Sequence, residues 1–168
     1  MCNAEALSGV PLRRDMAAVA DWTRARLGTP DGNALYATLE DLPVAERSAR
    51  LALAASALGI PSCPLAAAYD RLVDDGRVRA DMQHLCSRIT FPDLIDLAGG
   101  ERAAAIERWI DAEGATTPVR ALGPPIRAAA TPQDRAQILN EAARSVDVLT
   151  CDVAKDLLAP DPADASPE

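Results

Sequence analysis

The chain has 168 residues, of which 49% are apolar, 25% charged and only 3% aromatic. That is the size of one ordinary domain or of two very small ones, with a core built mainly from aliphatic side chains and alanine. The formal net charge of -8 argues against a nucleic-acid partner, because phosphate binding needs clustered lysine and arginine.

A membrane-spanning helix needs roughly 18 uninterrupted apolar residues, and no segment meets this requirement. The longest apolar run, residues 51–60, is short and rich in alanine. The sequence therefore predicts no transmembrane segment.

The first predicted helices carry the two tryptophans. Helices are expected over 12–27 and 100–113, and each of these segments is followed by a glycine. Shorter helices are expected over 34–39 and 119–129, with Pro124 and Pro125 distorting the second one.

The remaining predicted helices carry or precede the later cysteines. From Leu51 onward, apolar residues recur at i, i+3, i+4 and i+7, and the stretch from Leu139 repeats that pattern. The helix that follows residue 62 is expected to end at Gly76, and a connecting helix is expected over 78–89. No segment alternates β-branched and polar residues, so the predicted fold is all-α.

The two halves of the chain resemble each other. When Arg47 is aligned with Arg135, the next twenty positions run without a gap and Cys63 falls on Cys151. The rare residues also fall close to register: they are Trp22 with Trp109, and Cys2 with Cys86. The alternative is a chance match between two alanine-rich helices.

Self-similarity of this kind predicts a tandem duplication. We expect a helical bundle made of two copies of a helical unit of roughly 80 residues, the first over 1–83 and the second over 84–158. The two repeats either fold separately or share one core. The Pro- and Asp-rich tail, 159–168, is expected to be disordered.

The cysteine spacing excludes several chemistries. No Cys-x-x-Cys motif is present, which argues against thioredoxin-like redox activity and against close zinc-ligand pairs. Met82, His84 and Cys86 offer ligands that suit copper. On a helix, however, His84 points to the opposite side from the other two. This arrangement is more typical of two core residues beside an exposed histidine.

An even cysteine count favours two structural disulfides. The preferred pairing joins Cys2 to Cys63 and Cys86 to Cys151, because a single ancestral copy could have formed such a bond alone. The other two pairings stay open, as do four buried free thiols that act as small apolar residues.

Disulfides indicate an oxidising compartment, so a periplasmic or extracellular location is expected, with an upstream signal or anchor removed. The alternative is a cytoplasmic protein with free thiols. A lipid-modified Cys2 is a variant of the first hypothesis.

No constellation for acid–base, nucleophilic or phosphate chemistry emerges from the sequence. The function expected is that of an exported, non-enzymatic helical binding or protein-interaction module, without a cofactor and with another protein as partner. Trp22 and Trp109 either line a groove between the repeats or anchor the core. The alternative functions are a copper or haem binder with Met, His and Cys ligands, and an enzyme that uses carboxylates alone, for which the candidates are Asp15, Asp21, Asp93 and Asp96. The oligomeric state stays open.

Overall fold

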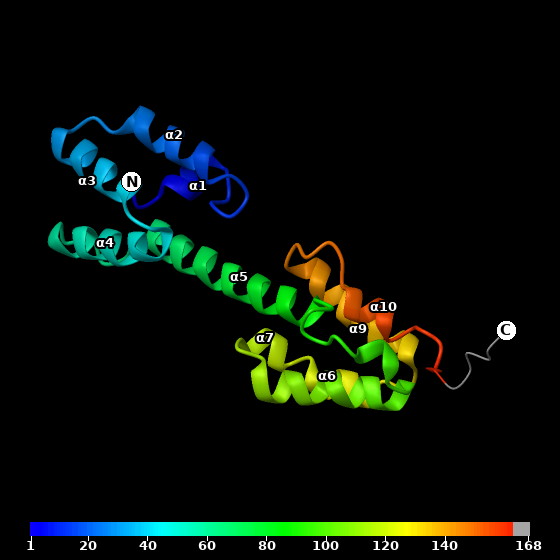
Figure 1. Ribbon diagram of the computed structural model, residues 1–168. Coiled ribbons are helices and arrows are strands. Elements are labelled where there is room, and N and C mark those ends of the chain that lie inside the picture. The colour runs from blue at the N-terminus through cyan, green and yellow to red at the C-terminus, as the bar shows by residue number, and fades with distance from the viewer. Residues whose placement is uncertain (163–168) are drawn as a thin grey trace. The chain divides into compact units, whose positions relative to one another are not determined.

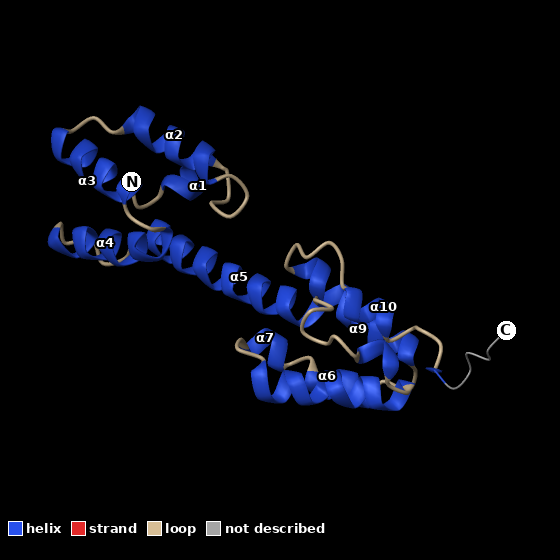
Figure 2. Ribbon diagram, in the orientation of Figure 1, coloured by secondary structure: helices blue, strands red, loops and turns tan. Residues whose placement is uncertain are grey.

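A computed structural model describes residues 1–162 of the chain. Over that range the structure consists of helices and connecting loops without a strand (Figure 2). The predicted all-α fold is therefore confirmed. The chain divides into two compact units, Met1–Asp74 and the part that begins at Asp75 (Figure 1).

The first unit contains four helices and the beginning of a fifth: α1 (Ala4–Ser8), α2 (Met16–Arg26), α3 (Pro30–Asp41), α4 (Val44–Ala57) and α5 (Pro64–Cys86). The helix expected from residue 12 begins later, because the Asp15 carboxylate accepts a hydrogen bond from the Ala18 N–H at 2.8 Å and caps α2 there. Leu12 stays in the preceding loop, where it is buried and its N–H donates to the Glu5 carboxylate.

The second unit contains the end of α5 and a further set of short and long helices: the 3-10 turn η1 (Leu94–Asp96), α6 (Gly99–Glu113), α7 (Thr117–Arg120), α8 (Gly123–Ala128), α9 (Pro132–Ser145) and α10 (Asp152–Asp156). The single helix expected over 119–129 is split in two, because Pro124 and Pro125 fit only the first turn of a helix and start α8. Thr131 caps α9 by accepting from the Asp134 N–H at 3.1 Å.

Helix α5 passes without a break through Gly76, so the expected helix end at that residue is wrong. A glycine inside a helix costs about 1 kcal/mol relative to alanine but does not terminate it. The space where a Gly76 side chain would lie is open. The two expected segments are thus one helix.

Each unit has its own apolar core. Leu12, Val19, Leu39 and Leu51 are central to the first core, and Trp22 packs against it. The second core is larger, and its fully buried members include the following residues: Leu85, Ile106, Ile110, Val119, Ile126 and Leu139. Both cores include buried alanines beside the larger aliphatic side chains, and small side chains allow helices to pack closely.

The aligned halves share local structure as well as sequence. After α4 the Ile60 N–H donates to the Ala55 carbonyl at 2.9 Å, and after α9 the Val148 N–H donates to the Ala143 carbonyl at the same distance. The residue just before each donor has a positive φ, 67° at Gly59 and 60° at Asp147. Both helices therefore end in the same left-handed turn.

The first residues of the tail 159–168, which is expected to be disordered, make defined hydrogen bonds to the rest of the second unit. Arg102 donates to the carbonyls of Ala159 and Pro160, and the Asp161 carboxylate accepts from the Gly99 N–H at 2.7 Å. The prediction is wrong for these first tail residues, because a buried donor and a helix N-terminus hold them. Residues 163–168 of the predicted tail lie outside the described residues.

Candidate functional site

Two disulfide bonds are present, one in each unit. Cys2 is bonded to Cys63, with a Cα–Cα distance of 4.7 Å, and Cys86 is bonded to Cys151, with a Cα–Cα distance of 4.4 Å. The expectation of two disulfides is confirmed, with the pairing that the sequence favoured. The first bond joins the segment before α1 to the segment after α4, and the second joins the end of α5 to the segment after α9.

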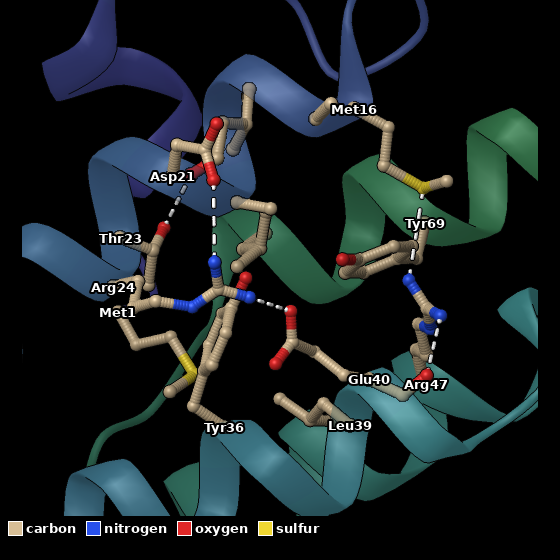
Figure 3. A pocket seen from close by; sticks show the side chains of 14 residues that line it. Met1, Met16, Asp21, Thr23, Arg24, Tyr36, Leu39, Glu40, Arg47 and Tyr69 are labelled. Atoms are coloured by element: carbon tan, nitrogen blue, oxygen red, sulfur yellow. Dashed lines mark hydrogen bonds and ion pairs between the residues drawn. The ribbon is translucent and has the colours of Figure 1, made fainter.

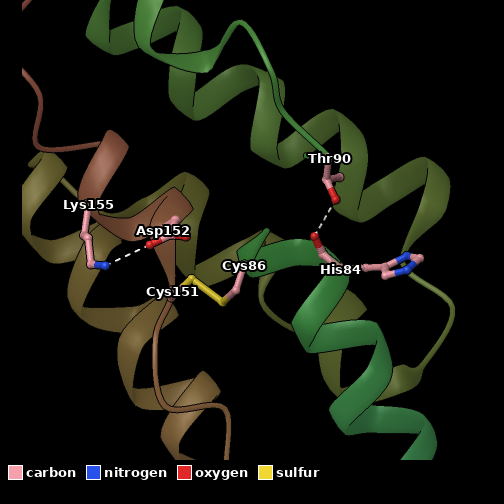
Figure 4. Close-up of a disulfide and its surroundings, with 6 residues drawn as sticks. All are labelled: His84, Cys86, Thr90, Cys151, Asp152 and Lys155. Atoms are coloured by element: carbon pink, nitrogen blue, oxygen red, sulfur yellow. Dashed lines mark hydrogen bonds and ion pairs between the residues drawn. A yellow bond between two sulfur atoms is a disulfide. The ribbon is translucent and has the colours of Figure 1, made fainter. Parts of the chain in front are cut away.

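The residues considered for copper do not come together. The sulfur of Cys86 is bonded to Cys151, and Met82 is buried in the second core. Figure 4 shows the imidazole of His84 directed away from the disulfide. Within residues 1–162 no group of three or more His, Cys, Asp or Glu side chains could hold a metal ion.

Each tryptophan packs within its own unit. Trp109 meets the ring of Phe91 edge-on, with 5.9 Å between ring centroids, and packs against the second core. Trp22 packs against the first core, and the guanidinium of Arg26 lies 4.3 Å from its ring centroid. The two indoles thus have different neighbours.

A groove lies beside Trp22 in the first unit and has a volume of about 470 Å³. Its walls include Leu7, Leu27 and Ile60, and Arg26 carries the only charged side chain in the lining. Arg26 makes no ion pair with any residue in the described part of the chain. Sequence reasoning missed this residue, although its position four after Trp22 predicts that the two side chains are neighbours on a helix.

The first unit also exposes a surface without charge. Residues 51–69 contain no Asp, Glu, Lys, Arg or His. Within this stretch Leu53, Leu58 and Ile60 are 63%, 74% and 40% exposed. We call the exposed residues of 51–62 the uncharged face; they are Ala52, Leu53, Ser56, Ala57, Leu58, Gly59, Ile60, Pro61 and Ser62.

The aligned stretch of the second unit is different. Residues 139–157 contain six charged residues: Glu141, Arg144, Asp147, Asp152, Lys155 and Asp156. Most of them are exposed, and Asp147 pairs with Arg79 at 2.7 Å. The lack of charge is therefore a property of the first unit, because the same succession of a helix, a turn and a second helix carries charged residues in the second unit.

A second cavity of the first unit, about 330 Å³ in volume, is lined by charged and aromatic groups that interact with one another (Figure 3). Arg24 forms an ion pair with Glu40, and its guanidinium lies 5.6 Å from the Tyr36 ring centroid. Arg47 lies 5.8 Å from the Tyr69 ring centroid. Burial, and after it the Glu40 carboxylate, raises the pKa of Tyr36. These side chains hold α2, α3, α4 and α5 together.

The structure gives local roles to two of the four carboxylates considered for catalysis, Asp15 and Asp21, and none to Asp93 and Asp96. Asp15 caps α2 and Asp21 lies 3.4 Å from the Arg24 guanidinium. Asp93 precedes η1 and Asp96 is its last residue, and both are exposed. The arrangement of Asp15 and Asp21 is that of structural acids on a helical surface.

Among residues 1–162, no helix combines the length and the apolar character that crossing a membrane requires. No family model, curated protein or solved structure matches the chain.

Proposed function

We propose that the protein is an exported, non-enzymatic interaction module, in which the first of two disulfide-closed helical units binds another protein through the uncharged face. The exposed leucines of that face carry the proposal. Contiguous exposed apolar surface is uncommon on soluble monomers and marks sites of interaction. Binding a partner would remove Leu53 and Leu58 from water.

The comparison between the two units supports this interpretation. Position 53 of the first unit aligns with Glu141, and Ser56 aligns with Arg144. Charged side chains at these positions are compatible with the helix, since α9 carries them. An apolar face that folding does not require is best explained by a contact made in function.

The disulfides support export. Such bonds persist in oxidising compartments and are rare in the cytosol. Because each bond closes one unit, each unit is stabilised outside the cell or in the periplasm without help from the other.

We also propose that the two units descend from one duplicated module. The matching order of cysteine, tryptophan, arginine and cysteine supports this, together with the shared turn after α4 and α9. In this view the partner-binding face arose, or was kept, in one copy alone.

A photo-reactive amino acid placed at position 53, and in a separate variant at position 141, tests the binding role. The experiment is done with the full chain in the cells that produce it. We expect a discrete covalent adduct with another protein from position 53 and none from the matched position 141. Equal labelling from both positions, or no adduct from position 53, would contradict the proposal.

A thiol count on denatured, unreduced protein recovered from the same cells tests export separately. We expect no free thiol before reduction, because all four cysteines are paired. Four free thiols would place the chain in a reducing compartment and remove the support for export.

A further inference from the structure

We propose that the groove beside Trp22 receives an apolar segment of the partner protein that carries a carboxylate, and that Arg26 pairs with this carboxylate. The inference rests on the proposed function, since it names the chemistry of the partner that the first unit binds.

The position of Arg26 is the first argument. The central carbon of its guanidinium lies over the Trp22 ring at 4.3 Å from the centroid. The attraction between a cation and an aromatic ring does not use the N–H groups as conventional hydrogen-bond donors, so the fork of the guanidinium can still match the two oxygens of a carboxylate. The contact with the ring also restricts the side chain before binding, so less rotamer entropy is lost on complex formation.

The second argument is charge complementarity. Arg26 is the only charged side chain of the groove, in a chain whose net charge is -8. It has no ion-pair partner among the described residues. In the second unit the residue four positions after the tryptophan is Glu113. The cation beside the indole is therefore specific to the unit that also has the uncharged face.

The groove has apolar walls and continues onto the uncharged face, and this favours a protein segment over a small molecule. Leu7 is 68% exposed at the groove, and Ile60 lines both this groove and the adjoining cavity beside Ala52 and Pro61. An extended or helical segment could place one aliphatic side chain beside Trp22 and others along α4.

Selection from a displayed library of random 12-residue peptides tests the inference, with the full oxidised chain as the target. We expect enriched peptides that combine aliphatic residues with at least one Asp or Glu. Changing that acid to its amide in a synthetic peptide should weaken binding about tenfold or more, because hydrogen bonds between ionised groups are among the strongest in proteins. The variant Arg26→Glu should lose binding to a similar extent.

The control variant Arg50→Glu makes the same change of charge at an exposed position of α4 outside the groove, and it should bind the peptides as the parent does. In a Trp109→Phe background the emission of Trp22 reports directly on the groove. Peptide binding should change this emission, and Arg26→Gln should reduce the peptide affinity as Arg26→Glu does.

Several outcomes would overturn the inference. Enriched apolar peptides without an acidic residue, or peptides that bind Arg26→Glu unchanged, would refute the role of Arg26 but leave the proposed interaction module standing. Dodecanoate that binds tightly at Trp22 where no peptide does would make the ligand a lipid. A concentration-dependent dimer in sedimentation, disrupted by Arg26→Glu, would make the partner a second copy. No enriched peptide together with no adduct from position 53 would refute both proposals.

Discussion

Replacing Arg102 with methionine is expected to destabilise the second unit strongly. The Arg102 side chain is 0% exposed. Its guanidinium donates to the carbonyls of Leu94 (3.2 Å), Ile95 (2.9 Å), Pro160 (2.9 Å) and Ala159. Methionine retains much of the aliphatic stem but donates no hydrogen bond, so all four carbonyls lose the donor that Arg102 supplies. The Leu94 carbonyl keeps a second donor, the Leu97 N–H at 3.3 Å.

The size of the effect follows from those bonds. Hydrogen bonds from a charged donor contribute about 1.5–3 kcal/mol each, but removing the guanidinium from water offsets part of this. We take a net value of about 1 kcal/mol per bond, which gives a loss of about 4 kcal/mol. For a unit of fewer than 100 residues, this corresponds to a fall in Tm of roughly 15–30 °C.

The assay is thermal and urea unfolding followed by the emission of Trp109 in a Trp22→Phe background. The matched control is Arg108→Met, which makes the same chemical change at an exposed position of α6. Ending the chain at Leu158 removes two of the four acceptors and should not add fully to the effect of Arg102→Met. If Arg102→Met and Arg108→Met unfold within about 1 kcal/mol of each other, the reasoning is wrong, because a buried charge replaced by an apolar side chain can also be neutral.

Three further outcomes are expected. Replacing Cys86 and Cys151 together with serine should lower the unfolding free energy by about 4 kcal/mol in the chain-entropy account, measured by urea unfolding against the parent. Gly59→Ala should cost about 1 kcal/mol because of its positive φ, whereas Gly76→Ala should stabilise by up to about 1 kcal/mol in the helix interior; effects of the same sign would contradict this. Because the pKa of Tyr36 is raised in the folded state, its contribution to stability is full below the ordinary pKa of 10.0 and is lost as the pH rises through the folded-state pKa. The free energy of unfolding of the parent should therefore fall more between pH 9 and pH 12 than that of Tyr36→Phe, measured by urea unfolding at each pH.

The helical class and the disulfides could be predicted because their signals are local or numerical. Apolar periodicity from Leu51 and Leu139 specifies helices, and an even cysteine count favours bonds. Helix boundaries were harder to predict, since they depend on competition between nearby groups. Asp15 caps α2 after the predicted start, and Gly76 is tolerated because propensity is a weak influence within a long helix.

The candidate site was only partly accessible to sequence reasoning. Trp22 was singled out, but the groove also needs Leu7 and Ile60, which come from distant parts of the chain. Arg102 shows the same limit. In sequence it is one more arginine near a helix start, and two of its four acceptors, the carbonyls of residues 159 and 160, are nearly 60 residues away along the chain.

The two disulfides follow one another along the chain and are neither nested nor crossed. Of the three pairings that four cysteines allow, this is the one in which both bonds can form in the order in which the cysteines appear along the chain. During synthesis Cys2 and Cys63 are both available before Cys86 has been added to the chain. The disulfide of the first unit can therefore form while the second unit is still unfolded. The order of synthesis itself then protects against wrong pairing, and correct oxidation would depend little on a disulfide isomerase.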